Sequence, residues 1–443
     1  MSGTVATLLA DRGVSADALE VQRAALLAFA EEMYAPLRRC DQRAKAECYT
    51  RGLMIDGRRK SMQPMAERLG EVDDQGLQQF ISDSPWDETA VRRRLARRMC
   101  AGLDVQAWAI DDSGMPKCGR LSPGVARQYC GELGKVANCQ VGVSVNAVSD
   151  VASCPLDWRL FLPAEWDQDR GRRARARIPA EVRHRSKWQL ALDMLDELAE
   201  WGLAPPVVVA DAGYGEIAAF REGLEARELA YVVQVKGSTT AYPADAELEQ
   251  PAYQGCGRPS VPRYSQKRSN LRELVLAAGR KATVDVTWRE GSRGALQSQF
   301  VALHVRPVGS RRNAGGERPE RWLLAEWPAD AEEPVKYWLS DLPADTPIGR
   351  LVRLGKLRWR IEHDYRELKQ CLGLGHYEGR SWHGWHHHVT CVSVAHAFLT
   401  LWRLGHFLPA APDELEPCAN AEEPQPIRGD RQARAGPPHR AAA

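Results

Sequence analysis

Residues 358–369, RWRIEHDYRELK, hold three acids and four bases, and one of these carboxylates lies among three of the cations at helical spacing. At 100° per residue, with Arg358 set at 0°, Glu362 falls at about 40°. On the same wheel Lys369 falls at about 20° and Arg366 at about 80°, so all four side chains share one face. The same spacing puts Glu367 on the far side, in solvent. The charged row is either an exposed face of helical ion pairs or a site at which a carboxylate and cations act together.

The arc beside this row is apolar, which gives the predicted helix a face to bury. Its members are Leu354, Leu357, Ile361, Tyr365, Leu368 and Leu372.

Two further carboxylates follow short strand candidates. Asp111 ends the segment WAID, and Asp211 ends the all-apolar run PVVVA. In an open α/β sheet, strand ends are where loops gather functional groups in a cleft. An aspartate in such a place can also be a simple turn former.

The order of the predicted elements says how these acids are positioned. Three strands, a helix, a strand, a helix and a strand follow one another, which is the order of a ribonuclease-H-like mixed five-stranded α/β sheet with helices on both faces. The segments are 108–111, 138–148, 154–163, 187–202, 205–210, a helix from about 216, and 231–235. In that sheet the first and fourth strands are neighbours, so Asp111 and Asp211 nearly meet.

Two carboxylates so close are unfavourable unless a cation lies between them. A third acid, Glu362, delivered by a helix packed on the sheet, completes an oxygen-rich cage for two Mg²⁺ ions. Such ions lie ~3.5–4 Å apart and activate both the attacking and the leaving oxygen of a phosphoryl displacement.

Changes in composition and periodicity along the chain predict five segments. A helical N-terminal DNA-binding domain is followed by the first part of the core, a β-rich insertion, the C-terminal helices of the core and a disordered tail. Their bounds are 1–104, 105–236, 237–343, 344–407 and 408–443. In the first segment, Ser61 is a candidate N-cap, and a second helix opens with Ser84 as N-cap, Pro85 at its first position and Asp87 in the capping-box place.

The composition is that of a soluble globular protein, with 27% charged and 44% hydrophobic residues among 443. The net charge of +2 hides a basic region, since residues 34–70 hold nine Lys/Arg against four Asp/Glu and VRRRLARR (91–98) follows. Such segments bind nucleic acid or form solvated helix faces. The eleven cysteines lack C-x-x-C spacing, and no signal peptide or membrane-spanning run is seen, so we expect reduced thiols in a cytoplasm and no membrane partner.

These motifs resemble the DDE transposases of bacterial insertion sequences, in the cut-and-paste branch with a β-strand insertion. That branch carries Y-(2)-R-(3)-E-(6)-K, of which Arg358, Glu362 and Lys369 match the last three positions. Gly355 stands where the tyrosine is expected. DAGYG (211–215) is similar to the block around the second aspartate, and IDDSGM (110–115) looks like the first block, with Asp111 the better match and Asp112 its rival.

The resemblance covers roughly residues 30–405. It includes GRRKSMQPMAERLG, ARQYCGELGKVANCQVGVSV and LGLGHYEGRSWHGWHHH. It implies a transposase that binds the terminal inverted repeats of its element as a homodimer on double-stranded DNA, cuts each end and joins the 3′-hydroxyls to target DNA. Two Mg²⁺ ions, for which Mn²⁺ substitutes, are implied as cofactors, and a bacterial cytoplasm as the location.

The resemblance also implies roles for particular residues. Asp111, Asp211 and Glu362 would carry the metals, and Arg358 and Lys369 would hold phosphates beside the scissile bond. Arg366, in the same cationic row, joins them as a DNA contact. Trp288, in VTWREG of the insertion, would stack on a base flipped from the DNA end, or would simply pack in a hairpin.

Three other readings stay open. The chain could be a DNA-binding protein that has lost catalysis, or a nuclease of the same fold that cuts without joining. A zinc hydrolase could be built on His376, His383 and His386–His388, although these lack typical zinc spacing.

Lys236, after YVVQV, reaches phosphate or caps a strand.

Overall fold

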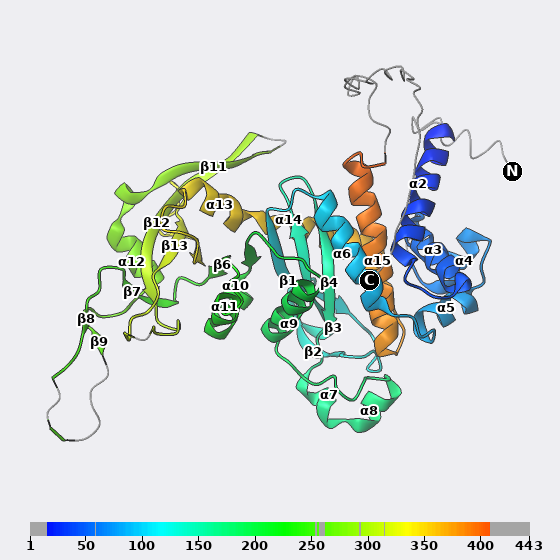
Figure 1. Cartoon of the computed structure of the whole chain (residues 1–443), viewed down its shortest axis with the longest axis horizontal. Helices are drawn as coiled ribbons and strands as arrows, with labels where there is room; N and C mark the ends of the chain where they lie inside the picture. Colours follow the sequence, from blue (N-terminus) through cyan, green and yellow to red (C-terminus); the bar gives the residue numbers. More distant parts are fainter. Residues whose placement is uncertain are drawn as a thin grey trace, which may run out of the picture. The chain divides into compact units, whose positions relative to one another are not determined.

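The computed structural model describes residues 16–57, 59–252, 255–256, 262–291, 294–313 and 315–407 (Figure 1). Its centre is a mixed sheet whose core strands lie in the order β4-β3-β1-β5-β6. These strands are β1 (Ala107–Pro116), β3 (Lys135–Val148), β4 (Ser153–Leu160), β5 (Val208–Ala210) and β6 (Tyr231–Val235). The first three are antiparallel and the last two run parallel to β1, so the predicted ribonuclease-H-like sheet is confirmed. A short strand, β2 (Ala126–Cys130), adds to β3.

Strand β1 is longer than predicted. It pairs with β3 along its whole length, from Ala107 opposite Val148 to Pro116 opposite Cys139. The prediction that a strand ends at Asp111 was therefore wrong, because the antiparallel ladder continues past it. Only the parallel ladder with β5 stops there.

Helices cover both faces of the core sheet. Neighbouring residues of β4 point to opposite faces. The Trp158 indole donates to the Ser393 hydroxyl of α15 (Trp382–Arg403) at 3.1 Å, whereas Arg159 pairs with Glu197 of α9 (Lys187–Glu200). One face therefore carries α15 and α14 (Trp359–Gln370), and the other carries α9, against which α11 (Ala218–Glu225) packs. The remaining short core helices are α7 (Ala164–Gln168), α8 (Arg170–Arg175), α10 (Ala212–Gly215) and the 3₁₀ turn η2 (Leu374–His376).

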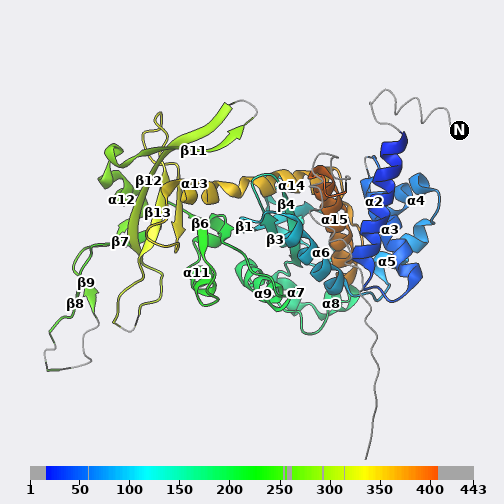
Figure 2. The same ribbon diagram turned by 45° about the horizontal axis from the view of Figure 1, so that its top comes forward.

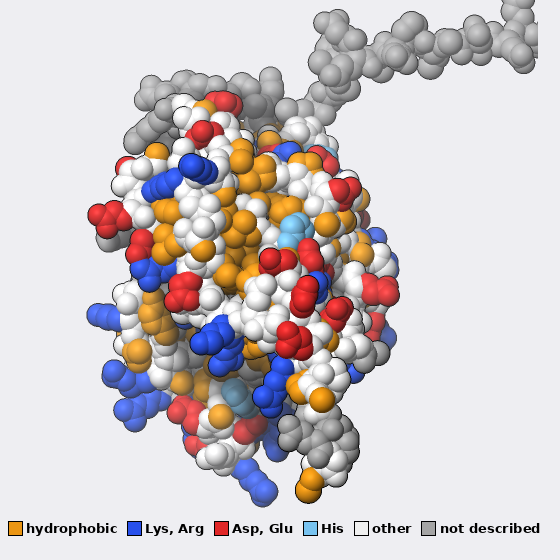
Figure 3. Space-filling view, turned by 90° about the vertical axis from the view of Figure 1, so that its left-hand side faces the viewer, with side chains coloured by type: hydrophobic (Ala, Val, Ile, Leu, Met, Phe, Trp, Pro, Cys, Tyr) orange, Lys and Arg blue, Asp and Glu red, His pale blue; other side chains and the backbone are white. Residues whose placement is uncertain are grey.

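The β-rich segment extends the core sheet. Strand β14 (Lys336–Ser340) pairs with β6, and β13 (Arg321–Glu326), β12 (Gly294–Pro307), β7 (Thr240–Pro243) and β10 (Ser269–Asn270) follow in order. Strand β11 (Val284–Gly291) forms a hairpin with β12, and β8 (Leu248–Glu249) pairs with β9 (Arg263–Tyr264) apart from the main sheet. Helix α12 (Leu271–Ala278) and the 3₁₀ turn η1 (Arg280–Ala282) complete the segment. Figure 3 looks onto its outer face, where apolar side chains gather in the middle of the view and charged ones lie around them.

The N-terminal region is helical, as predicted. Its helices are α2 (Ala16–Tyr34), α3 (Cys40–Met54), α4 (Met62–Leu69), α5 (Asp74–Ser82) and α6 (Glu88–Gly102). Ser61 is the N-cap residue of α4, although its side chain makes no capping bond. The predicted start of the next helix at Ser84 was wrong. Asp87 is the N-cap of α6 and accepts a hydrogen bond from the Thr89 amide at 2.9 Å, whereas the Ser84 hydroxyl accepts one from Nε2 of Gln42 at 2.8 Å.

The long helix predicted through residues 354–372 is two helices end to end. Helix α13 (Ile348–Leu357) stops one residue before α14 begins, and Arg358 between them keeps a near-helical backbone with φ −56° and ψ −27°. Figure 2 shows the pair running from the β-rich segment to the core strands. The six members of the predicted apolar arc are all buried: Leu354, Leu357, Ile361, Tyr365, Leu368 and Leu372.

Gly355 lies where the resemblance expects a tyrosine. A Cβ atom at this position would come within 3.3 Å of the Trp338 indole on β14. A tyrosine would therefore need Trp338 to move, which gives the departure from the motif a packing reason.

The described residues up to His406 belong to one compact unit. The predicted boundaries at 104, 236 and 343 remain predictions, and the predicted tail, 408–443, lies outside the described residues. Among the described helices, none combines the length and apolar character needed to cross a bilayer.

Candidate active site

The register of the sheet brings the first two predicted acids together. In the parallel ladder between β1 and β5, Ile110 lies opposite Ala210. Asp111 and Asp211 are the next residue of each chain segment, so they leave the ladder side by side. The prediction that they meet at adjacent strands agrees with this register.

Among the described residues the three predicted acids do not converge in one metal-binding group, and Glu362 is linked to Asp111 through an arginine. The Arg358 guanidinium donates from Nη1 to Oδ2 of Asp111 at 2.7 Å and from Nη2 to Oε1 of Glu362 at 3.0 Å. The Asp111 side chain is 13% exposed, whereas that of Glu362 is 63% exposed. Arg358 thus bridges a buried and an exposed carboxylate, and supplies the positive charge that the acids need.

The acids share an environment that resists negative charge. Burial raises the pKa of the Asp111 carboxyl to about 7; the Arg358 guanidinium opposes this shift. The charges of Asp211 and Asp112 add to the rise. Burial likewise raises the pKa of Asp211, again against the effect of Arg358. A site that holds two carboxyls in this way favours a cation beside them.

Asp112, the rival first ligand, has a different partner. Its carboxylate accepts a hydrogen bond from Lys187, the first residue of α9, at 3.0 Å, and lies 3.5 Å from the Tyr214 hydroxyl. Successive side chains of a strand point to opposite faces. The Asp111 side chain therefore points to the face of the sheet that carries Arg358 and α14, and the Asp112 side chain points to the face that carries α9.

The DAGYG segment holds Asp211 in place. Its carboxylate accepts a hydrogen bond from the Gly213 amide at 2.9 Å, as N-cap of the short helix α10. Helix α10 packs on β6 so closely that a Cβ atom on Gly215 would lie 2.1 Å from the Gln234 carbonyl oxygen. The last glycine of the motif is thus needed for the turn that follows the acid.

The other predicted DNA contacts on α14 differ in their availability. The Lys369 ammonium donates to the Gly114 carbonyl and to Glu132, in the turn between β2 and β3, both at 2.8 Å. Arg366 is exposed and forms no ion pair with the described residues. Neither Glu132 nor Lys187 was predicted as a neighbour of the site, because pairing over such sequence distances leaves no local pattern.

Trp288 is half-buried at a bulge of β11, where the register with β12 shifts between Thr287 and Arg289. Its ring meets Phe300 edge-on with centroids 5.8 Å apart, and the Lys356 ammonium lies 4.5 Å from its centroid. The hairpin-packing alternative thus describes its present contacts, and stacking on a DNA base stays a prediction.

The prediction that Glu367 lies in solvent was wrong. Its carboxylate is 9% exposed and accepts a hydrogen bond from Nη1 of Arg403 on α15 at 2.8 Å. The Nε2 atom of His396 lies 3.7 Å away. The prediction failed because α15 covers the side of α14 that the helical wheel left open.

The buried histidines of α15 serve packing, whereas His383 is exposed. His386 and His388 are buried, and burial lowers the pKa of each to about 3. His387 stacks on Trp86 with centroids 3.9 Å apart, and His388 lies 2.8 Å from the Tyr49 hydroxyl. Within the described part of the chain, no three His, Cys, Asp or Glu side chains converge in a group that could hold a metal ion. These contacts give the zinc reading no support.

Lys236 lies 2.7 Å from the Glu216 carboxylate, so it is ion-paired at the end of β6.

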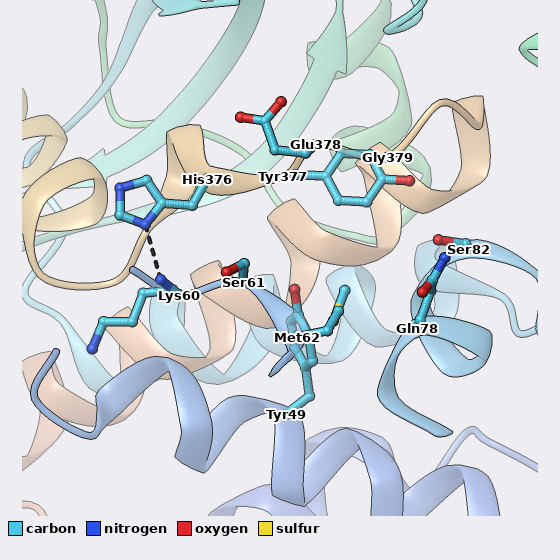
Figure 4. A pocket seen from close by; sticks show the side chains of 10 residues that line it. All are labelled: Tyr49, Lys60, Ser61, Met62, Gln78, Ser82, His376, Tyr377, Glu378 and Gly379. Carbon is cyan, nitrogen blue, oxygen red and sulfur yellow. Dashed lines mark hydrogen bonds between the residues drawn. The ribbon is translucent and has the colours of Figure 1, made fainter. Parts of the chain in front are cut away.

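A cavity of about 220 Å³ lies away from the acids, between the N-terminal helices and the segment that precedes α15 (Figure 4). Two of the segments that carry the resemblance meet there, since the Lys60 amide donates to Nδ1 of His376 at 3.1 Å. The lining includes Tyr49, Gln78 and Tyr377 but none of the predicted catalytic residues.

Comparison with known proteins identifies the family of the chain and agrees with this fold. The family described as DDE superfamily endonuclease matches residues 32–295, which include Asp111 and Asp211 and end before Glu362. The chain therefore belongs to this family of nuclease-type enzymes.

A particular relative is similar in sequence. The probable transposase for insertion sequence element IS701 of Microchaete diplosiphon is 30% identical over 191 residues, which is 42% of this chain and 47% of that protein. The chain thus spans about half the length of this relative in the alignment. The predicted resemblance to insertion-sequence DDE transposases is confirmed by both comparisons.

Proposed function

We propose that the protein is a metal-dependent DNA transposase. It binds the terminal inverted repeats of its own insertion sequence, hydrolyses a phosphodiester at each end and joins the freed 3′-hydroxyls to target DNA. The observation that carries the proposal is the position of Asp111 and Asp211 side by side at the end of one parallel ladder, with Glu362 linked to Asp111 through Arg358.

The donor set suits a hard divalent cation. Three carboxylates offer oxygen ligands of the kind that Mg²⁺ and Mn²⁺ take, and the burial that raises the pKa of Asp111 and of Asp211 favours a cation beside them. Asp111, Asp211 and Glu362 would hold the metal. Divalent ions bound there supply activation of the attacking oxygen and stabilisation of the leaving oxygen.

The chain's own residues position the DNA. Arg358 and Lys369 present guanidinium and ammonium groups on the side of α14 that faces β1. A phosphate offers them the same kind of acceptor that Asp111, Glu362 and Glu132 offer now. Arg366 is exposed on the same helix as a further phosphate contact.

Cleavage of the element's own flanking DNA tests the proposal. A plasmid that carries the gene with its natural flanks is incubated with the wild type in Mg²⁺, Mn²⁺ or EDTA. We expect cuts at fixed positions beside the gene, lost in EDTA and in the Asp211→Asn variant. Asp245→Asn, the same change on an exposed residue of the β-rich segment, serves as the matched control and retains cutting.

The two rivals differ in their products. A nuclease without joining activity cuts the plasmid but transfers no labelled 3′ end into a second plasmid. If the chain is a DNA-binding protein without catalysis, the wild type and the Asp211→Asn variant retard the flanking DNA equally in a gel. Neither then cuts this DNA in any divalent ion.

The proposed assembly is a homodimer that pairs two DNA ends. Light scattering of the complex with a duplex of the inverted repeat measures its mass. We expect two chains and two duplexes in one particle.

A further inference from the structure

The outward side of α6 carries an arginine cluster that the proposed chemistry does not use. Arg93, Arg94, Arg97 and Arg98 line a groove of about 600 Å³ together with Glu32, Pro36 and Ala90. Four cations thus face one carboxylate in a single concave surface. The groove shares no residue with the carboxylate site.

Arg92, the buried arginine of the same run, has a structural role. Arg92 is 4% exposed, pairs with the fully buried Asp157 at 2.8 Å and donates to the Trp158 carbonyl at 2.8 Å. Its charge is compensated by Asp157, and its two terminal guanidinium nitrogens donate hydrogen bonds within the fold. Removing it would take a cationic partner from the buried Asp157 carboxylate, which would keep its ion pair with Arg159 at 2.7 Å.

The groove arginines lack such partners. Arg97 donates to the Trp201 carbonyl at 2.9 Å, which leaves its charge uncompensated, and Arg98 lies 3.8 Å from Glu32. Arg93 and Arg94 are exposed and form no ion pair or hydrogen bond with the residues that the structure describes. The cluster therefore keeps an excess of positive charge, of which Glu32 balances one charge.

Its spacing carries an energetic penalty within the helix. Arg93 and Arg97 are four residues apart, as are Arg94 and Arg98, and like charges at this spacing destabilise a helix by about 0.2–0.5 kcal/mol per pair. No carboxylate of α6 follows at positions that would relieve the repulsion. An anionic ligand in the groove would relieve this repulsion between the arginines.

We propose that this groove binds the sugar–phosphate backbone of duplex DNA without regard to sequence. Guanidinium groups match phosphate oxygens in bidentate geometry. From Arg93 to Arg98 the helix rises about 7.5 Å, which spans about two phosphates of one strand along the duplex axis. The inference rests on the proposed function for the identity of the polyanion, and adds a contact surface separate from the site of cleavage.

Salt-dependent binding tests the groove directly. Fluorescence anisotropy of a 30-base-pair duplex of random sequence is measured with the full chain in EDTA, between 50 and 300 mM NaCl. Each lost phosphate contact lowers the slope of log affinity against log salt by about 0.9. The double variant Arg93→Gln/Arg94→Gln should therefore lose about 1.8 from that slope, and about 60-fold in affinity at 0.1 M salt.

The groove also offers a variant of opposite sign. Glu32→Gln removes its one carboxylate and should tighten binding of the same duplex. The double variant should keep the thermal midpoint of the wild type, since Arg93 and Arg94 are exposed. Asp245→Asn, an exposed residue of the β-rich segment that does not line the groove, should bind as the wild type does.

An unchanged salt slope in the double variant would overturn the inference. The inference would also be overturned if the double variant lost affinity for a fluorescent polyglutamate but not for duplex DNA, since the groove would then bind an acidic protein. A chain that fails to cut any DNA yet shows the reduced slope keeps the inference and loses the proposed catalytic function.

Discussion

The affinity of the carboxylate site for Mn²⁺ should depend steeply on pH. Burial raises the pKa of Asp111 to about 7, and a carboxyl must lose its proton before it binds a metal. Below pH 7 each unit of pH should weaken Mn²⁺ binding by about tenfold, and above about pH 8 the affinity should level off. The ratio between pH 8 and pH 6 is then about tenfold, or about 1.4 kcal/mol.

Calorimetric titration of the full chain with Mn²⁺, without DNA, measures this dependence. Repeating it at pH 6 in buffers of different ionisation enthalpy should show release of about one proton per chain, and at pH 8.5 almost none. Asp111→Asn should lose both the affinity and its pH dependence, whereas Asp245→Asn keeps them. Equal wild-type affinities at pH 6 and pH 8 would refute the assignment of a raised pKa to a metal ligand.

Three further outcomes follow from the same contacts. Gly215→Ala places a Cβ atom against the Gln234 carbonyl and should lower the free energy of unfolding by about 1–3 kcal/mol in urea titrations; no loss would contradict the packing. Glu132→Gln frees the Lys369 ammonium and should tighten binding of duplex DNA in EDTA, with unchanged affinity as the contrary result. His388 has a pKa of about 3 in the fold, below its ordinary value, so the stability it contributes is complete above about pH 6.5 and is lost as the pH falls, by about 1.4 kcal/mol per unit. His388→Gln should flatten the unfolding free energy between pH 6.5 and 4.5, and an unaltered profile would argue against it.

Local periodicity identified the parts of the site that lie within one element. The strand YVVQV has the bounds of β6, and the apolar arc of residues 354–372 is buried as its spacing requires. The pairing of Asp111 with Asp211 followed from the order of strands, because a sheet of that order fixes which ends are neighbours.

Contacts between distant segments could not be predicted in this way. The pairs Lys369–Glu132 and Glu367–Arg403 join residues that no local pattern relates. The interruption at Arg358 also escaped prediction, since a residue with a near-helical backbone leaves no breaker in the sequence.

Extension of the core sheet by the β-rich segment depends on edge pairing. Strand β14 completes the free edge of β6 by backbone hydrogen bonds, for which side-chain patterns carry little information.

Metal-dependent rescue of cleavage tests the central claim most directly. A thiolate is a poor ligand for the hard ion Mg²⁺ and a better one for Mn²⁺. If Asp211 binds the catalytic metal, the Asp211→Cys variant should cut the flanking DNA in Mn²⁺ but not in Mg²⁺, while Asp211→Asn cuts in neither. Cleavage by either variant in Mg²⁺ at the wild-type rate would show that Asp211 is not a ligand and would contradict the proposed active site.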